Sequence, residues 1–346
     1  MVESSVFPRN YEPVLNARQT ESAIKFIKET FERELSGELK LSRVTAPMFV
    51  EQGTGINDDL SGIERAVKFS VSKLSGRNME IVHSLAKWKR MVLADEKFDH
   101  GTGLYTDMNA IRADDDVDNI HSIYVDQWDW ERVIDKSEYN LDFLKKIVVK
   151  IYSALKRTEF LVCQHWTSLN YRLARDIVFV HSEDALKEYP DLTPEQRERK
   201  LAEKYGAVFV VGIGGKLADG KPHGLRAPDY DNWTEDTGNG HFGLNGDIIV
   251  WDDIRKDSLE LSSMGIRVDD KSLLLQLKLT GKEERKNLYW HKRLLSGDFP
   301  LTVGGGIGQS RVCMFLLHKA HIGEVQSSVW DDATLKEAAE HGVKIL

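Results

Sequence analysis

The sequence has few cysteines and no long apolar run, and both absences narrow the class of protein. Only two cysteines occur in 346 residues, Cys163 and Cys313, and neither has metal-ligand spacing around it. A disulfide framework is therefore not expected, and a cytoplasmic location fits best. Cys163 lies in an apolar helical pattern, which indicates simple packing. The longest apolar run, around residues 207–211, is too short for a membrane span, and no signal peptide is evident at the N-terminus.

The sequence also has fewer positively charged residues than negatively charged ones. The chain has 47 lysines and arginines against 55 aspartates and glutamates, for a net charge of −8. This balance argues against a nucleic acid as the main partner. The hydrophobic content of 41% and charged content of 29% are ordinary for a globular protein, and no repeat or linker marks a domain boundary.

Apolar periodicity predicts an α+β fold with a mostly antiparallel sheet flanked by helices. Residues 1–15 are weakly patterned, and we expect a loose extension there. The spacing predicts helices over 24–35, ended by Gly37, and over 144–155. Thr193 and Pro194 begin another helix that ends at Gly206. The expected strands cover residues 122–125, 177–180, 207–211, 248–251 and 259–261.

The most informative segment runs from Leu301 to Arg311, where a β-branched run passes into glycines and then into a helical pattern. Its glycines allow close approach to a ligand, and Arg311 could stack on a base or pair with phosphate. An ordinary glycine turn with a surface arginine is the alternative. The dinucleotide fingerprint fails because position 309 is Gln, and residues 211–217 lack P-loop spacing. Any nucleotide must bind on another scaffold.

A row of polar side chains is expected on one strand. After Tyr124, the polar residues Gln127, Asp129 and Glu131 alternate with two tryptophans. In a strand these polar side chains share one face. Such a row is costly to bury, so it either meets water or binds a polar ligand. The tryptophans indicate that the other face is buried, which makes the polar row a candidate site floor.

Three further segments concentrate charge, and each also has an ordinary interpretation. Residues 57–62 place two acids in a turn, which is also typical of a helix cap. Residues 83–90 gather cations around Trp88, which is also typical of a solvated basic helix face. Asp247 and Glu260 lie on two runs that could form a hairpin, and such a carboxylate pair suits Mg²⁺. Scattered acids on a surface hairpin are the alternative.

Taken in order, these segments resemble the catalytic domain of class II aminoacyl-tRNA synthetases. Arg112 lies on an early strand, Asp247 and Glu260 form the carboxylate pair on a hairpin, and Gly304–Arg311 is the glycine-rich strand leading to an arginine. Pro47 resembles the proline of the dimer motif of that fold. From residue 16 to the end, the chain resembles more closely the ammonia-dependent asparagine synthetase family, as a single catalytic domain. The segments that match are 59–62, 83–90, 124–131, 226–231, 261–267 and 304–311.

The resemblance implies a ligase that makes L-asparagine from L-aspartate, ATP and ammonia through a β-aspartyl-adenylate, with Mg²⁺ as cofactor. The implied catalytic residues are Arg112, Arg311 and Asp58, where Asp58 steers or deprotonates ammonium. The residues expected to bind aspartate are Asp58, Ser84, Lys89, Gln127, Asp129 and Asp231. Those expected to bind ATP are Arg112, Ser263, Arg267, Gly308 and Arg311. The expected metal ligands are Asp247 and Glu260.

Two other functions remain open at this point. One is an aspartyl- or asparaginyl-tRNA synthetase, against which stand the acidic balance and the lack of room for an anticodon-binding domain. The other is a non-catalytic nucleotide-binding paralogue, although both arginines and both metal carboxylates are present. Glutamine stays open as nitrogen donor, but a glutaminase with an N-terminal cysteine is excluded because residue 2 is Val. The resemblance also implies a homodimer.

Overall fold

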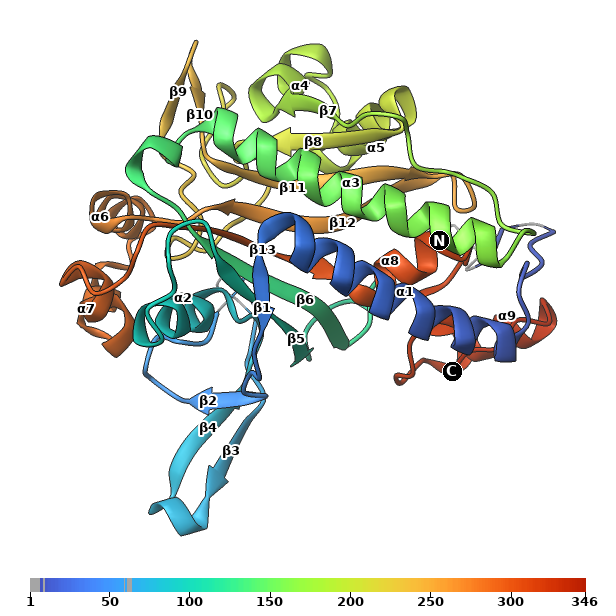
Figure 1. Cartoon of the computed structure of the whole chain (residues 1–346), viewed down its shortest axis with the longest axis horizontal. Coiled ribbons are helices and arrows are strands. Elements are labelled where there is room, and N and C mark those ends of the chain that lie inside the picture. Colours follow the sequence, from blue (N-terminus) through green and yellow to red (C-terminus); the bar gives the residue numbers. More distant parts are fainter. Residues whose placement is uncertain (1–6, 9, 59, 61–63) are drawn as a thin grey trace.

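The computed structural model describes residues 7, 8, 10–58, 60 and 64–346, and an eight-stranded sheet forms its centre (Figure 1). The strands lie in the order β1 (Leu41–Arg43), β5 (Gly103–Ile111), β6 (Tyr124–Val133), β13 (Thr302–Gly308), β12 (Asp257–Ile266), β11 (Asn245–Asp252), β8 (Ala207–Val211) and β7 (Val178–His181). Only the two outermost pairs, β1–β5 and β7–β8, are parallel. The prediction of a mostly antiparallel sheet in an α+β fold is confirmed.

Two long helices, α1 (Ala17–Leu39) and α3 (Leu141–His165), lie side by side on one face of the sheet (Figure 1). This is the face onto which Trp128 and Trp130 point, and the ring centroids of Phe31 and Trp128 are 4.6 Å apart. The predicted stop of α1 at Gly37 is wrong. The helix continues to Leu39 and is capped by Lys40 in the left-handed conformation, because its apolar stripe extends to the buried Leu39 and outweighs the helix-breaking tendency of one glycine.

Helices α2 (Ala86–Asp95) and α5 (Pro194–Tyr205) pack on the opposite face. Helix α5 begins with the predicted capping box of Thr193 and Gln196 and ends at Gly206. The remaining helices are α4 (Ser182–Glu188), α6 (Asp270–Leu279), α7 (Tyr289–Leu295), α8 (Gln309–Leu316) and α9 (Asp332–Glu340), with 3₁₀ turns η1 (Ser72–Leu74), η2 (Lys136–Glu138), η3 (Glu283–Asn287) and η4 (Ile322–Glu324). No helix in the described residues is both long enough and apolar enough to cross a bilayer.

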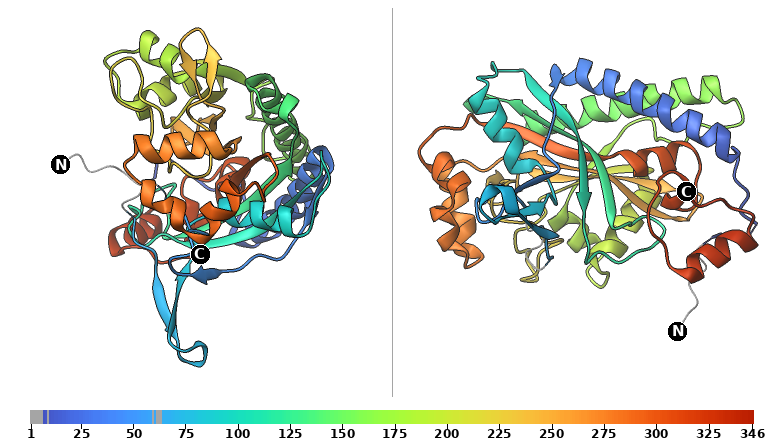
Figure 2. Two further views of the ribbon diagram at one scale, coloured as in Figure 1. Left: turned by 90° about the vertical axis from the view of Figure 1, so that its left-hand side faces the viewer. Right: turned by 90° about the horizontal axis from the view of Figure 1, so that it is seen from below.

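Two small sheets extend from the main body. Strands β2 (Phe49–Glu51), β4 (Arg77–Ile81) and β3 (Lys68–Val71) form an arm that projects well away from the central sheet, as Figure 1 and the left view of Figure 2 show. A shorter hairpin joins β9 (Asp236–Gly238) and β10 (His241–Phe242).

The N-terminal segment is not loose where the structure describes it, so that prediction is wrong for Phe7, Tyr11 and Leu15, which are all buried. The Tyr11 hydroxyl donates to both carboxylate oxygens of Glu324 at 2.9 Å, and Lys319 Nζ donates to the carbonyl of Leu15 at 3.2 Å. These partners lie more than 300 residues away in the chain, so local sequence patterns cannot predict the contacts.

Candidate active site

The candidate site is built on one row of residues that crosses four strands. The register pairs Asp247 of β11 with Ser263 of β12, Ser263 with Gly306 of β13, and Gly306 with Asp129 of β6. Paired residues in adjacent strands point to the same face. The predicted polar row of β6 therefore shares its face with the predicted metal residue Asp247, opposite the face covered by α1 and α3.

Alternate glycines of β13 make room for this polar row. Gly304 and Gly306 pair with Glu131 and Asp129. A Cβ at Gly304 would clash with Glu131 Oε2, and one at Gly306 would clash with Gln127 Oε1. These clashes exclude any side chain without a shift of the polar residues. The alternate glycines of β13 are thus explained by the polar side chains of β6, which occupy the space that side chains on β13 would need.

A buried ion network lies beneath this floor. Lys89 Nζ donates to Asp129 Oδ1, with which it makes a close ion pair, and to the carbonyls of Trp130 and Gly305, both at 3.0 Å. Its three hydrogens therefore have partners in this structure. Arg267 donates to both oxygens of Glu131 at 2.9–3.2 Å.

The network has one carboxylate more than it has cations. Arg267 Nη1 also donates to Asp231 Oδ1 at 2.5 Å. Asp129, Glu131 and Asp231 thus face Lys89 and Arg267, and all five side chains are nearly fully buried. Burial raises the pKa of Asp231 despite the charge of Arg267. Asp129 Oδ2 is buried and has no hydrogen-bond partner among the described residues. A buried carboxylate oxygen without a partner suits a ligand that brings a hydrogen-bond donor.

A cavity of about 520 Å³ opens beside the polar row. The predicted residues that line it are Arg112, Gln127, Glu260, Gly308 and Arg311. The two arginines enter from different elements, because Arg112 follows β5 whereas Arg311 belongs to α8. Arg112 Nη2 donates to the carbonyl of His83 at 3.3 Å, and its buried Nε has no partner within the described part of the chain.

The predicted metal carboxylates come from one hairpin, as expected. A β-bulge between Ile248 and Ile249 shifts the register between them. Asp247 is buried and accepts two hydrogen bonds of 2.5 Å from Arg226 Nη2, which also donates to Ser263 Oγ at 3.2 Å. Glu260 accepts from Arg311 Nη1 at 3.4 Å. Burial raises the pKa of Asp247 to about 7, with the charge of Glu260 acting in the same direction and Arg226 opposing it.

Asp58, Ser84 and Arg267 are not among the residues that line the cavity. Asp58 is 5% exposed, and its Oδ1 accepts from the Leu60 amide at 3.1 Å. Residues 59 and 61–63 of the predicted motif lie outside the described residues. Ser84 Oγ accepts from the Ala86 amide at 3.1 Å at the start of α2. Arg267 is held by Glu131 and Asp231 away from the cavity wall, so its contact with ATP stays a prediction.

Glu131 was predicted only as part of the polar row, and Arg226 and Asp126 received no role from the sequence. Glu131 and Arg226 each neutralise a predicted site residue, Arg267 and Asp247. Asp126 lines the cavity, accepts from the Ser310 amide at 3.0 Å and pairs with Lys28 of α1 at 3.2 Å. The sequence shows that these segments are charged, but it does not show which residues they pair with, because the partners lie far away in the chain.

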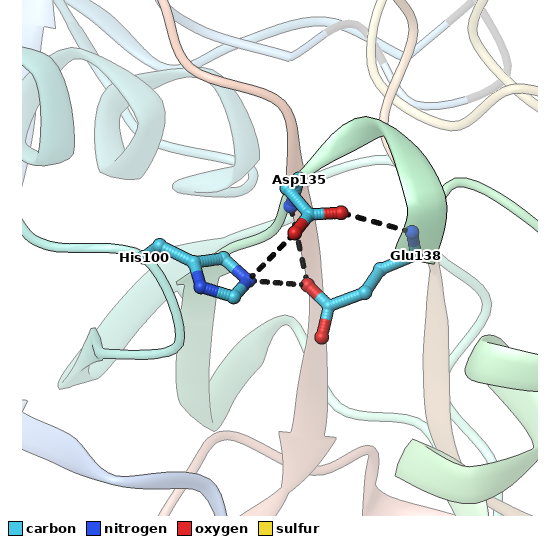
Figure 3. Close-up of side chains that lie close together, drawn as sticks. All are labelled: His100, Asp135 and Glu138. Atoms are coloured by element: carbon cyan, nitrogen blue, oxygen red, sulfur yellow. Dashed lines mark hydrogen bonds and ion pairs between the residues drawn. The ribbon is translucent and has the colours of Figure 1, made fainter.

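One cluster with metal-compatible side chains lies elsewhere, at His100, Asp135 and Glu138 (Figure 3). His100 Nε2 lies 2.7 Å from Glu138 Oε2. Both carboxylates already serve the 3₁₀ turn η2, since Asp135 accepts from the amides of residues 137 and 138 and Glu138 accepts from the amide of Asp135. None of the three lines the cavity. This cluster is therefore a solvent-facing capping arrangement.

Known structures place this fold among the class II synthetases. The chain is similar to asparaginyl-tRNA synthetase from Entamoeba histolytica, with a TM-score of 0.66 and 15% identity. The match covers 90% of this chain and 66% of the synthetase, so the chain spans slightly less than two thirds of that protein. The asparaginyl-tRNA synthetase from Pyrococcus horikoshii gives a TM-score of 0.64 at 17% identity, over 89% of this chain and 68% of that one. At these identities the likeness establishes the class II catalytic fold.

Sequence relatives define the family within that class. The chain is 55% identical to an aspartate–ammonia ligase of Parabacteroides distasonis over 339 residues, 98% of each protein. It is 52% identical to that of Clostridium perfringens strain SM101 over the full length of both. The family described as aspartate-ammonia ligase matches residues 18–342. The chain belongs to the aspartate–ammonia ligase family.

Proposed function

We propose that this protein makes L-asparagine from L-aspartate, ammonia and ATP, with AMP and pyrophosphate as the other products. The observation that carries this proposal is the juxtaposition of two sites. A buried floor with one excess carboxylate adjoins a cavity of about 520 Å³ lined by Arg112 and Arg311. The floor suits the ammonium group of an amino acid, and the arginines suit the phosphates of a nucleotide.

Aspartate is proposed to bind with its α-ammonium group at Asp129 and Asp231, beside Gln127. Asp129 Oδ2 supports this assignment, because a bound ammonium group would donate to an oxygen that has no partner among the described residues. The same ammonium group would balance the excess negative charge of the buried network. Ser84 and Lys89 are the residues proposed for the carboxylates of aspartate. Lys89 would have to exchange one of its present carbonyl partners to reach them.

Mg²⁺ is proposed at Asp247 and Glu260, and these side chains fit a divalent cation. The raised pKa of Asp247 reflects burial and the nearby charge of Glu260, an electrostatic cost that a bound cation would relieve. Carboxylate oxygens are the ligands that Mg²⁺ prefers. When bound, Mg²⁺ would neutralise charge on the phosphate oxygens of ATP.

The reaction consists of two displacements in the same site, first of pyrophosphate and then of AMP. In the first, a β-carboxylate oxygen of aspartate bonds to the α-phosphorus of ATP and pyrophosphate leaves. In the second, the ammonia nitrogen bonds to the β-carbonyl carbon, the bond from that carbon to the AMP oxygen breaks, and the nitrogen loses a proton. Arg112 and Arg311 would stabilise negative charge that develops at the α-phosphate. Asp58 is proposed to steer or deprotonate the incoming ammonium.

The rim of the cavity argues against RNA as a substrate. Four aspartates of the loop after β5 line it, at positions 114, 115, 116 and 118, together with Glu64. Clustered carboxylates repel a polyanion such as the acceptor arm of a tRNA. Among the described residues, the rim therefore offers no basic surface that would favour the synthetase-like alternative.

We also propose that the protein acts as a homodimer in the cytoplasm. Met48, Phe49 and Phe69 are 51%, 47% and 38% exposed next to Pro47 of the predicted dimer motif, and the two phenylalanine rings make an edge-to-face contact with centroids 5.2 Å apart. Such a patch favours a protein partner. Sedimentation equilibrium should give twice the chain mass of 39.4 kDa. A Phe49→Ser/Phe69→Ser variant should weaken this association, and a monomeric wild type would contradict the proposal.

The function is tested by separating its two steps. Aspartate-dependent exchange of labelled pyrophosphate into ATP reports the first step without ammonia, and chromatography of asparagine and AMP reports the whole reaction. Asparagine and AMP should form in equal amounts, without any need for tRNA. Asp129→Asn should lower aspartate-dependent exchange by about 100-fold, because a charged acceptor is lost. Formation of AMP only when tRNA is added would overturn the proposal. Replacing ammonium with glutamine tests the second nitrogen donor.

A further inference from the structure

The two carboxylates proposed for Mg²⁺ differ in how accessible they are. Both lie on one face of the β11–β12 hairpin, because Glu260 pairs with Ile249, two residues after Asp247. Glu260 lines the cavity of the candidate site, and its side chain is 41% exposed. Asp247 is buried and does not line this cavity. A metal ion shared by the two carboxylates must therefore reach an aspartate whose oxygens already accept from Arg226.

The contact between Arg226 and Asp247 uses only one nitrogen of the guanidinium group. Arg226 Nη2 donates to both Asp247 oxygens at 2.5 Å and to Ser263 Oγ at 3.2 Å, which is three acceptors for two hydrogens. A guanidinium group binds a carboxylate more strongly when two of its nitrogens donate to it, as a fork. Here Nη1 donates to the carbonyl of Leu225 at 3.1 Å, and Nε is buried without a partner among the described residues. The guanidinium group thus has donors that the carboxylate does not use.

The charges at this hairpin sum to zero. Arg226 pairs with Asp247. Arg311 Nη1 lies 3.4 Å from Glu260 Oε2, so two guanidinium groups balance two carboxylates. A divalent cation that joined them alone would leave two positive charges in excess, and like charges this close repel strongly. The phosphates of ATP would supply the missing negative charge. The charge balance therefore favours a metal ion that enters together with the nucleotide.

The two arginines differ in how firmly they are held. Arg311 Nε donates to the carbonyl of Ile120 at 3.3 Å, and its Nη1 donates to the carbonyl of Glu260 at 3.1 Å. These backbone contacts hold Arg311 independently of the Glu260 carboxylate. The backbone contact of Arg226 is with Leu225, its neighbour in the chain, and does not fix the guanidinium group relative to β11. Arg226 is therefore the arginine that can turn away from its carboxylate.

We propose that Arg226 is a phosphate-binding residue that occupies the metal carboxylate Asp247 until Mg²⁺ and ATP bind, an inference that rests on the proposed function. Arg226 then exchanges the carboxylate for phosphate oxygens, and its Nε gains the acceptor that it lacks in this structure. Before that exchange, Arg226 neutralises a buried charge that would otherwise be costly. One residue thereby couples the binding of the metal ion to the binding of the nucleotide.

The first test measures binding of Mn²⁺, used in place of Mg²⁺, by the electron paramagnetic resonance signal of the free ion. Nucleotide and aspartate are left out. Arg226→Met removes the competing cation, so its affinity for Mn²⁺ should be about tenfold higher than that of the wild type. Arg226→Met/Asp247→Asn should lose this gain. Arg43→Met is the matched control, because it removes an arginine that pairs with Asp107 outside the cavity, and its Mn²⁺ affinity should equal that of the wild type.

The second test measures binding of ATP by equilibrium dialysis with Mg²⁺ present and aspartate absent. Arg226→Met should weaken ATP binding about tenfold, because a charged donor to the phosphates is lost. Arg226→Lys retains the charge but not the planar group, so it should weaken ATP binding about threefold and leave Mn²⁺ binding close to that of the wild type. Urea unfolding checks that each variant folds, and Mn²⁺ should stabilise Arg226→Met more than the wild type.

Two results would overturn the inference. One is an equal Mn²⁺ affinity of Arg226→Met and the wild type, and the other is unchanged ATP binding in Arg226→Met, which would leave Arg226 as a structural partner of Asp247. If Arg226→Met does not fold, Arg226→Lys decides the question, and wild-type ATP affinity in that variant would overturn the inference. A wild type that binds ATP but shows no aspartate-dependent pyrophosphate exchange would instead overturn the proposed function, which keeps the two failures distinct.

Discussion

At residue 306 a single methyl group is expected to change substrate binding without unfolding the chain. A Cβ there would clash with Gln127 Oε1, and the flexible Gln127 side chain can turn away. Gly306→Ala should therefore raise the KM for aspartate about tenfold, because the amide leaves the site floor. The cost in unfolding free energy should be about 1–2 kcal/mol, as for a small overpacking change. Steady-state kinetics and urea unfolding measure the two effects.

Gly37 provides the matched control for this change. It lies inside α1, and a Cβ there meets no described atom within 4 Å. Gly37→Ala should stabilise the protein by about 0.5–1 kcal/mol, because alanine restricts the unfolded chain and favours the helix. The KM for aspartate should not change. Equal kinetics for the two alanine variants would show that the glycines of β13 do not shape the substrate floor.

Residue patterns revealed the polar floor but not its ion pairs. The alternation of Gln127, Asp129 and Glu131 with tryptophans is local, and a strand converts it directly into two faces. The partners of these side chains come from elsewhere, since Lys89 belongs to α2 and Arg267 follows β12. The spacing of residues along one strand cannot identify these partners. Lys89 and Arg267 were predicted as site residues from the family resemblance, and only the structure shows their ion pairs.

At the scale of elements, capped helices and short buried strands were predicted best. The box at Thr193 and the apolar run at 207–211 gave α5 and β8 with their observed bounds, because local hydrogen bonds and continuous burial determine both. Strand β6 covers Tyr124–Val133. Its apolar residues marked a strand only over 122–125, whereas the alternation of polar residues with tryptophans indicated its continuation to Glu131.

The junction between α4 and the β9–β10 hairpin is expected to be sensitive to acid. His181 Nε2 donates to the carbonyl of Phe242 at 3.0 Å, and its Nδ1 accepts from the Glu183 amide at 3.1 Å. The ring also stacks on His241, with centroids 4.0 Å apart. Burial lowers the pKa of His181 to about 4, and protonation would destroy the acceptor that caps α4.

The unfolded chain binds this proton more readily, because a free histidine has a pKa of about 6.5. The unfolding free energy should therefore fall as the pH drops from about 6.5 to about 4, and His181 should account for about 2 kcal/mol at pH 5. Urea unfolding at pH 7 and pH 5 measures this loss. His181→Asn, which retains a capping side chain, should reduce it by that amount, whereas the exposed His165→Asn should not. Equal pH dependence in all three proteins would contradict the assignment.

At the scale of the whole molecule, the two ends of the chain form one packed unit. Phe7 lies among Tyr11, His321 and His341, with ring centroids 5.5–6.0 Å from each. Its amide donates to Glu337 Oε1 at 3.1 Å. The same unit positions η4, whose Ile322 lines the cavity of the candidate site. The weakly patterned start of the sequence therefore contributes to the site, which a prediction from local periodicity could not detect.

Removal of the Phe7 side chain tests this long-range closure. Phe7 is 0% exposed, so Phe7→Ala should lower the unfolding free energy by about 3 kcal/mol, because it loses buried apolar contacts and leaves a cavity. Val14→Ala, at a position that is 41% exposed, should change it by less than about 0.5 kcal/mol. Urea unfolding followed by tryptophan fluorescence measures both. A loss below about 1 kcal/mol for Phe7→Ala would mean that the segment detaches before the core unfolds, as a loose extension would. In that case hydrogen exchange should show the amides of η4 opening together with it, since Tyr11 joins this turn through Glu324.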